Sequence, residues 1–173
     1  TRHECMTILY GASTRNGKGT LCESVLKVLG SYGCTARPET LAQKNNANSS
    51  QPTEDIARLA GVRFVNISEP GKGLVLNAAQ VKSMTGNDTI NARFLHENSF
   101  DFQPLFKLYI NTNYLPAVND MTIFTSGRVI IIPFERHFDE SEQDKSLKLE
   151  FSKPEVQSAI LNWLLEGYAL LQK

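Results

Sequence analysis

The stretch MTILYGASTRNGKGT, from Met6 to Thr20, decides how the rest of the chain is interpreted. An apolar run that favours a β-strand ends in a loop of small residues, and this loop passes into a helix-like segment, Leu21–Leu29. A strand, a loop and a helix in this order are the context of a Walker A phosphate-binding loop. We therefore predict that the loop binds a nucleotide through ten residues: Gly11, Ala12, Ser13, Thr14, Arg15, Asn16, Gly17, Lys18, Gly19 and Thr20.

The chemistry of such a loop is electrostatic, because its backbone N–H groups and the helix N-terminus point at the phosphates. Lys18 adds a cation for the β- and γ-phosphates. The match to G-x-x-x-x-G-K-[ST] is incomplete: Ala12 takes the place of the first glycine, and Gly19 stands where a Mg²⁺-binding hydroxyl is expected. Thr20 is rotated by roughly a quarter-turn or more round the helix, so we expect it to reach Mg²⁺ through water. The alternative is a glycine-rich turn before an ordinary helix.

The composition is that of one domain, which we predict to span residues 1–173. The formal net charge is zero, so contacts with DNA should be local or multiplied by assembly of several subunits. Three cysteines without C-x-x-C spacing indicate neither a disulfide framework nor a zinc site. No signal peptide or spanning segment is recognisable, which favours a cytoplasmic protein without a membrane partner. Because the chain does not begin with Met, we expect it to be a fragment of a longer protein.

Apolar runs of strand length alternate with segments of helical spacing, which predicts an α/β fold. We expect a mostly parallel central sheet flanked by helices, and a helical tail that packs through Val156, Ile160, Trp163, Leu164 and Leu170. The predicted strands are Cys5–Tyr10, Arg63–Ser68, Leu108–Asn111 and Val129–Pro133, and the predicted helices after the first are Thr53–Leu59, Asn77–Met84 and Pro154–Gln172. Thr35–Ala42 is ambiguous, Gln43–Gln51 is a polar loop, and Thr89–Leu95 pairs with Phe100–Phe102 in a hairpin whose tip begins at His96.

Functional groups collect beyond the carboxyl ends of parallel strands, so the residues just after each predicted strand are candidates for a site. Ser68 and Glu69 come after the second strand, and a carboxylate there can polarise the water that attacks a γ-phosphate. Asn113 comes after the third, where an amide can bind both the water and the phosphate. The alternatives are an ordinary surface glutamate before Pro70 and an ordinary turn asparagine.

Arg128 precedes the fourth predicted strand, in the sequence Ser126-Gly127-Arg128. An arginine on the rim of the domain can reach the γ-phosphate of a neighbouring subunit and neutralise charge in the transition state. The alternative is a solvated arginine at the start of a strand. Each of these sites is weak by itself, and their order along the chain is the stronger signal.

This order resembles that of the superfamily 3 helicases of small DNA viruses, phages and plasmids, and most closely the C-terminal ATPase of phage and plasmid primase-helicases. The similar passages span nearly the whole chain: YGASTRNGKGT (10–20), LAGVRFVNISE (59–69), VKSMTGNDTINAR (81–93), FQPLFKLYINTNYLP (102–116), RVIIIPFERHF (128–138) and ILNWLLEG (160–167).

The resemblance implies an AAA+-like P-loop ATPase that forms a ring, with a hexamer expected, and translocates on single-stranded DNA in the cytoplasm of a bacterial host. ATP and Mg²⁺ are the implied cofactors, and a primase is the implied fused or associated partner. The implied catalytic residues are Lys18, Glu69, Asn113 and Arg128, the implied metal site comprises Thr20, Ser68 and Glu69, and the implied DNA contacts are Lys82, Arg93 and His96.

Two residues depart from the pattern of the family. Gly19 replaces the magnesium-binding hydroxyl, and Ser68 replaces an acid. Both weaken the expected metal shell, which keeps open a second function: a nucleotide-binding assembly or switch module of a replication protein without unwinding activity. A P-loop phosphotransferase is disfavoured, because it needs a lid with several arginines and the tail from Glu140 to Lys173 has none.

Overall fold

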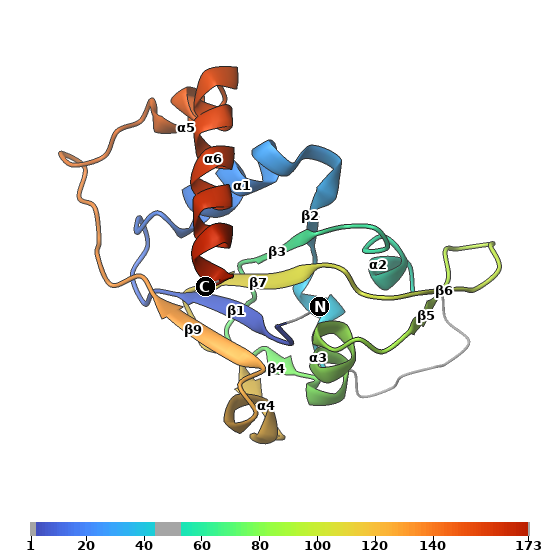
Figure 1. The fold of residues 1–173 in the computed structure, drawn as a ribbon. Coiled ribbons are helices and arrows are strands. Elements are labelled where there is room, and N and C mark those ends of the chain that lie inside the picture. The colour runs from blue at the N-terminus through green and yellow to red at the C-terminus, as the bar shows by residue number, and fades with distance from the viewer. Residues whose placement is uncertain (1–2, 44–52, 173) are drawn as a thin grey trace.

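The computed structural model describes residues 3–43 and 53–172 and shows a central sheet of five strands (Figure 1). All neighbouring strands of this sheet are parallel. The strands lie in the order β2 (Gly33–Ala36), β3 (Phe64–Ser68), β7 (Lys107–Thr112), β1 (Met6–Tyr10) and β9 (Val129–Pro133). This arrangement confirms the predicted α/β fold with a mostly parallel sheet.

Helices cover both faces of the sheet (Figure 1). On one face lie α1 (Lys18–Leu29) and α6 (Pro154–Leu171), which contact each other. On the other face lie α3 (Ala78–Thr85) and α4 (Thr122–Thr125). The remaining helices are short: α2 (Glu54–Ala57), α5 (Leu147–Glu150) and the 3₁₀ turns Gly30–Tyr32 and Pro38–Thr40. Within the described residues, no helix combines the length and the apolar character that crossing a membrane requires.

Two small pairs of strands lie outside the central sheet. The parallel pair β4 (Val75–Leu76) and β8 (Ala117–Val118) is one of them. The other is the predicted hairpin, in which β5 (Ile90–Ala92) and β6 (Phe100–Phe102) are antiparallel. The hairpin prediction is therefore confirmed. The segment Thr35–Ala42, which the sequence left ambiguous, begins in strand β2, which ends at Ala36, and continues into a 3₁₀ turn. Of the predicted polar loop Gln43–Gln51, residues 44–51 lie outside the described residues.

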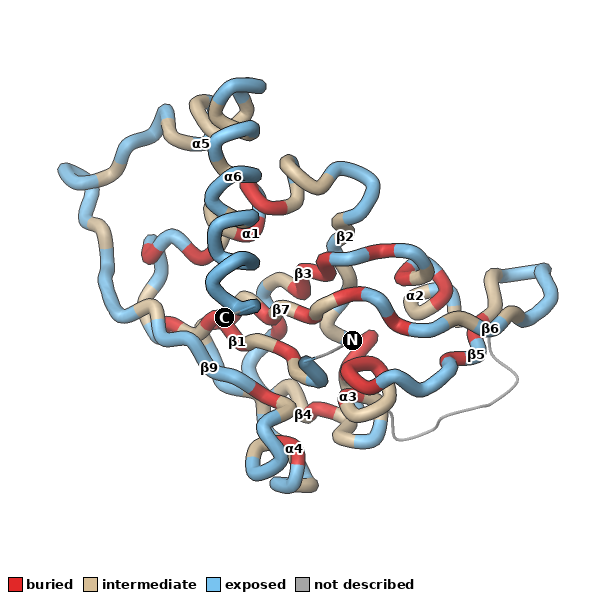
Figure 2. Tube along the Cα trace, viewed as in Figure 1, coloured by how far each residue is buried: buried red, intermediate tan, exposed pale blue. Residues whose placement is uncertain are grey.

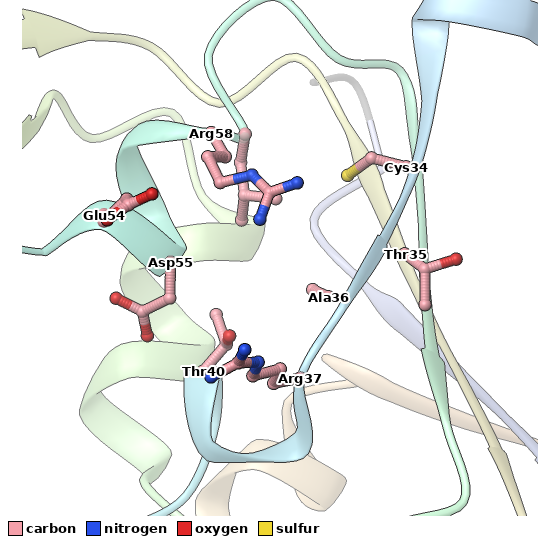
Figure 3. A pocket seen from close by; sticks show the side chains of 9 residues that line it. Cys34, Thr35, Ala36, Arg37, Thr40, Glu54, Asp55 and Arg58 are labelled. Atoms are coloured by element: carbon pink, nitrogen blue, oxygen red, sulfur yellow. The ribbon is translucent and has the colours of Figure 1, made fainter. Parts of the chain in front are cut away.

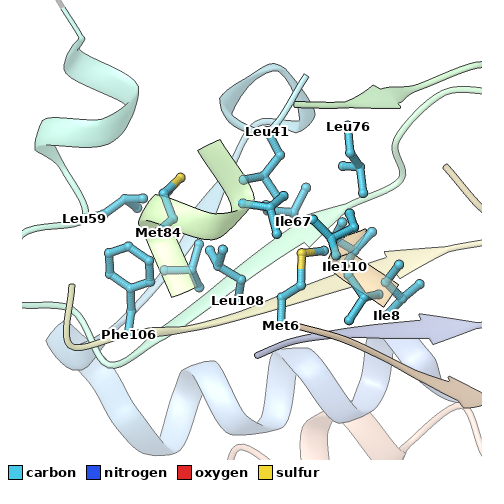
Figure 4. Close-up of a cluster of buried hydrophobic side chains, with 14 of the residues drawn as sticks. Met6, Ile8, Leu41, Leu59, Ile67, Leu76, Met84, Phe106, Leu108 and Ile110 are labelled. Carbon is cyan, nitrogen blue, oxygen red and sulfur yellow. The ribbon is translucent and has the colours of Figure 1, made fainter. Parts of the chain in front are cut away.

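The core lies between the sheet and the side that carries α3 (Figures 2 and 4). The central strands β1, β3 and β7 contribute fully buried side chains, because parallel strands covered on both faces have little contact with water. Residues from the loops, from β4 and from α3 close this cluster: Leu41, Leu59, Leu76, Met84 and Phe106. This continuous core holds the carboxyl ends of β1, β7 and β3 rigidly side by side.

The C-terminal helix packs less completely than predicted. Val156, Ile160 and Leu164 form a half-buried stripe, whereas Trp163 is 59% exposed and Leu170 is 69% exposed. The expectation that Trp163 and Leu170 pack against the domain is therefore wrong. The helix touches the domain mainly through α1, so only one narrow face finds a partner within the described chain.

Candidate functional site

Lys18, Asn113 and Glu69 come after three neighbouring strands at the same edge of the sheet. β7 lies between β1 and β3, and backbone hydrogen bonds continue past all three strand ends: the Gly11 N–H donates to Thr112 O at 3.2 Å, and the Glu69 N–H donates to Asn111 O at 3.0 Å. The structure thus brings three of the four predicted catalytic residues to one edge.

Several carbonyl groups of the loop between β1 and α1 accept hydrogen bonds. The amide of Asn113 donates to Ser13 O at 2.7 Å, and the Asn16 amide donates to the same oxygen at 2.8 Å. Three further bonds come from the segment after β9: Phe134 N to Tyr10 O at 2.6 Å, His137 Nδ1 to Thr14 O at 2.7 Å, and Phe138 N to Arg15 O at 2.9 Å.

The backbone N–H groups of the same loop have no hydrogen-bond partner in the part of the chain that the structure describes. None of residues 12–17 donates its backbone N–H to a group within residues 3–43 or 53–172. Arg15 (φ 54°) and Gly17 (φ 86°) have left-handed backbone conformations that allow this tight winding, and Gly17 leads directly into α1. Successive N–H groups in such a loop, followed by a helix N-terminus, form an anion-binding nest.

Lys18 is the buried cation of this nest, with only 3% of its surface exposed. Its Nζ donates to Asn16 Oδ1 at 2.9 Å and to Gly11 O at 3.3 Å, which are both neutral acceptors. Burial lowers the pKa of Lys18, because the charged form loses its hydration without gaining a negative partner. A bound phosphate would supply that partner, so the residues present fit a nucleoside triphosphate.

The predicted metal residues fit Mg²⁺ only in the company of phosphates. Ser68 Oγ accepts a hydrogen bond from Asn66 Nδ2 at 2.6 Å, and Glu69 has a left-handed backbone conformation (φ 50°) at the end of β3. No group of three or more His, Cys, Asp or Glu residues that could hold a metal occurs among the described residues. One carboxylate, two hydroxyls (Thr20 and Ser68) and water suit Mg²⁺, which commonly binds through few carboxylates plus substrate phosphates.

A cavity of about 350 Å³ adjoins the nest on the side of β9. Its lining joins the loop to the strand end beside it: Tyr10, Gly11, Ala12, Ser13, Pro133, Phe134 and Glu135. A second cavity, of about 200 Å³, lies at the end of β2 and is lined by Arg37, Arg58 and their neighbours (Figure 3). The second cavity contains none of the predicted site residues.

Arg128 lies apart from the other three catalytic candidates. It precedes β9 and therefore stands at the opposite edge of the sheet, where its side chain is 24% exposed. Its guanidinium bonds Glu4 Oε2 at 3.0 Å, Thr85 Oγ1 at 3.1 Å and Lys82 O at 3.3 Å. Within one chain it cannot join the nest, and a role toward a neighbouring subunit requires it to exchange these bonds.

The predicted DNA contacts fall into two places. Lys82 lies on α3 and forms an ion pair with Asp120 at 2.7 Å, with a further bond to Thr122 Oγ1 at 2.8 Å. This hydrogen bond from Lys82 holds the pKa of Asp120 well below its usual range. Arg93 and His96 lie on the hairpin, where His96 has a left-handed backbone (φ 63°) and is exposed at the tip. The hairpin also carries carboxylates, so its charge is mixed.

Sequence reasoning missed the segment Phe134–Phe138, and it named Asn16 only as one of the ten residues of the nucleotide-binding loop. The signal for the segment was present, because the rule that looks beyond the carboxyl ends of strands applies to Val129–Pro133 as well. The predicted site included Arg128, at the start of that strand, and no residue beyond its end. The side-chain contacts of Asn16 with Ser13 O, Lys18 Nζ and Phe134 O were not predicted.

The family model that matches this chain describes a family of unknown function (DUF5906), and the match covers residues 9–128. A solved structure, the A form of the apo NrS-1 C-terminal region, shares the fold with a TM-score of 0.65 over 86% of this chain and 34% of that chain. Its sequence identity is 16%, so the likeness concerns the fold alone.

The chain is also similar to viral proteins. “Putative helicase 022R” of Frog virus 3 is 36% identical over 137 residues, which are 76% of this chain and 14% of the relative. “Putative helicase L207/L206” of Acanthamoeba polyphaga mimivirus is 32% identical over 148 residues, 85% of this chain and 15% of the relative. “Putative primase C962R” of African swine fever virus is 26% identical, and the similar region covers 64% of this chain and 12% of the relative. The chain thus spans about a seventh of these relatives, and they give no support to the expected bacterial host.

Proposed function

Because the chain belongs to the DUF5906 family, and because viral proteins similar to it carry helicase and primase names, we propose that it is the ATPase module of a viral DNA-replication helicase of the superfamily 3 type. One observation carries this proposal: within the described residues, the backbone N–H groups of residues 12–17 have no hydrogen-bond acceptor, and they lie in the loop that leads to buried Lys18. That arrangement is complementary to the phosphates of ATP.

The residues at the edge of the sheet divide the work of hydrolysis. The nest and Lys18 bind the phosphates, and Glu69 accepts a proton from the attacking water as a general base. Mg²⁺, when bound, neutralises charge on the β- and γ-phosphates. Asn113 donates to Ser13 O, and a γ-phosphate oxygen competes for that amide. When the Asn113 amide exchanges Ser13 O for a γ-phosphate oxygen, it acts as a sensor of that phosphate. The position of Asn113 at the end of β7 favours this role.

The outer parts of the proposal concern assembly and DNA. Subunits assemble into a ring, Arg128 of one subunit serves the ATP of the next, and Lys82, Arg93 and His96 contact single-stranded DNA. A neutral chain can act on DNA in this way, because a ring repeats a few channel-facing cations around one strand. A primase domain or partner belongs to the same replication protein in this proposal.

The alternative is a switch module that binds ATP without unwinding DNA. Gly19 and Ser68 favour it, since the Ser68 hydroxyl is already bonded by Asn66 and no second acid stands beside Glu69 in the predicted metal site. The two functions differ in one measurable property. Single-stranded DNA accelerates ATP turnover by a helicase and leaves turnover by a switch module unchanged.

The first test separates ATP binding from hydrolysis. Lys18→Ala should remove binding of a fluorescent ATP analogue, because the nest loses its only buried cation among the described residues. Glu69→Gln should keep binding within about twofold and lower phosphate release by a factor of about 10² or more, as expected for a general base. Lys145→Ala and Glu166→Gln, both at exposed positions, serve as matched controls. Equal phosphate release by wild type and Glu69→Gln would remove Glu69 from this role.

A further inference from the structure

We propose that His137 is a positioning residue for nucleotide binding, which acts through the Thr14 carbonyl and the segment 134–138. The inference rests on the proposed function, since it concerns the same nest. Figure 1 shows this segment leaving the end of β9 beside the loop that joins β1 to α1. Nothing in the order of the motifs predicts it, because Thr14 and His137 are 123 positions apart in the sequence.

The backbone of the segment brackets the nest at both ends. At the start, the Phe134 N–H donates to Tyr10 O at 2.6 Å, and Phe134 O accepts from Asn16 Nδ2 at 3.4 Å. At the other end, the Phe138 N–H donates to Arg15 O at 2.9 Å. The segment therefore runs alongside the loop from Tyr10 to Arg15 and continues the parallel pairing of β1 with β9 beyond the sheet.

His137 supplies the one side-chain contact from this segment to the middle of the loop, within the described residues. Its Nδ1 lies 2.7 Å from Thr14 O, and a carbonyl oxygen can only accept, so Nδ1 carries the proton. This is also the only hydrogen bond that Thr14 O accepts from residues 3–43 and 53–172. Both the Nδ1–H tautomer and the imidazolium ion can form it.

The planarity of the peptide bond links this contact to the phosphate site. Thr14 C=O and Arg15 N–H belong to one peptide unit and point in opposite directions. A hydrogen bond that holds the Thr14 carbonyl toward His137 therefore keeps the Arg15 N–H directed away from His137, as a donor of the nest. Without His137 the unit is free to rotate, and the nest loses a donor from the middle of its row.

The segment has contacts of its own that do not involve the nest. Arg136 forms an ion pair with Glu142 at 2.8 Å, and its guanidinium lies 4.5 Å from the centre of the Phe138 ring. His137 is exposed and contributes nothing to the buried core. Its replacement should leave the fold intact, which separates a positioning role from a merely structural one.

The test compares His137→Ala with His137→Asn in this chain. The Asn amide nitrogen stands at the same distance from Cβ as Nδ1, so it can donate to Thr14 O where Ala cannot. We expect His137→Ala to weaken binding of a fluorescent ATP analogue by about three- to tenfold, as for one lost hydrogen bond, and His137→Asn to restore it. In the ATPase assay KM should rise in the Ala variant while kcat stays within about twofold. Arg136→Ala, on the same segment, is the control.

The outcomes separate this inference from the proposed function. If wild type binds the analogue and His137→Ala binds it equally well, the inference is wrong and the proposed function stands. If wild type does not bind the analogue at all, both are wrong. If His137→Ala proves unfolded by circular dichroism, His137→Asn decides: wild-type affinity supports the positioning role, and affinity weakened as expected for Ala overturns it.

Discussion

Gly11 stands one position before the first glycine of the usual phosphate-loop pattern, and its surroundings explain why a side chain is excluded there. A Cβ at this position would lie 2.2 Å from Asn16 Nδ2 and 2.5 Å from Phe134 O. The second atom belongs to the backbone and cannot turn away. Gly11 is therefore needed for the close approach of the loop to the segment after β9, and not for an unusual φ angle.

Gly11→Ala is expected to lower both nucleotide affinity and stability. The methyl group must displace Asn16, which breaks its bonds to Ser13 O and Lys18 Nζ, or push the backbone at Phe134 outward. Overpacking of this kind costs typically about 1–3 kcal/mol, and we expect ATP-analogue affinity to fall at least about tenfold. Gly167→Ala, on exposed helix α6 with open space around it, is the matched control. Wild-type affinity in Gly11→Ala would contradict the close packing described here.

The site residues that could be predicted are those that come after a strand. Lys18, Glu69 and Asn113 were predicted as site residues because each comes after an apolar run. The order of strands in the sheet places those runs side by side. His137 was not predictable, because its contact with Thr14 joins two segments that are 123 positions apart in the sequence. Whether these residues perform the proposed chemistry stays a prediction.

At the scale of elements, the ion pair between Lys82 and Asp120 joins helix α3 to the residues just before helix α4. This pair neutralises the cation that the family resemblance assigns to DNA. Both side chains are about 40% exposed, so solvent screens the pair and its contribution to stability is small. A DNA phosphate can therefore compete with Asp120 for Lys82.

Asp120→Asn should release Lys82 and strengthen binding to single-stranded DNA by a few-fold, on the order of 0.2–1 kcal/mol. The Asn side chain keeps the oxygen that accepts from the Thr122 N–H at 2.9 Å, so the start of α4 is preserved. Fluorescence anisotropy with a labelled oligonucleotide at several salt concentrations measures the effect. Glu166→Gln makes the same change of net charge elsewhere, and an equal gain in that variant would show that Lys82 is not a DNA contact.

The boundaries of helices and strands were predictable where the residue types in the sequence mark them. Val129–Pro133 agrees with β9 at both ends, and the hairpin arms fall on β5 and β6. Helix α1 begins three residues earlier than predicted, at Lys18, because the left-handed Gly17 allows the helix to start inside the loop. The exposure of α6 was not predictable, since an apolar stripe does not reveal whether the described chain offers it a partner.

At the scale of the whole molecule, the strand order is what assembles the nest and its neighbours. Sequence alternation predicts a parallel sheet, but it does not say that β7 inserts between β1 and β3. That insertion places Asn113 against Ser13 and Glu69 beside Asn111. Long-range pairing of this kind is decided by packing of the buried strands, which no local pattern contains.

The proposed ring predicts cooperative behaviour. ATPase activity per subunit should rise with protein concentration, because Arg128 acts only across an interface, and single-stranded DNA should increase the rate further. Binding to DNA should weaken steeply with salt, as expected for several phosphate contacts. A phosphate-release assay over a range of protein concentrations, with and without an oligonucleotide, measures this. A rate per subunit that is independent of concentration and of DNA would favour the switch module.

Strand β9 pairs with β1 on one side and with no other described strand, and its side chains Ile130, Ile131 and Ile132 are 46%, 41% and 43% exposed. Such an apolar edge is a template for unspecific strand pairing between chains. Association of the isolated chain can thus arise at this edge, and size measurements alone do not identify a functional ring. An Ile131→Lys variant distinguishes the two. Complexes formed by non-specific strand pairing should dissociate in this variant, whereas an assembly built through Arg128 should keep its size.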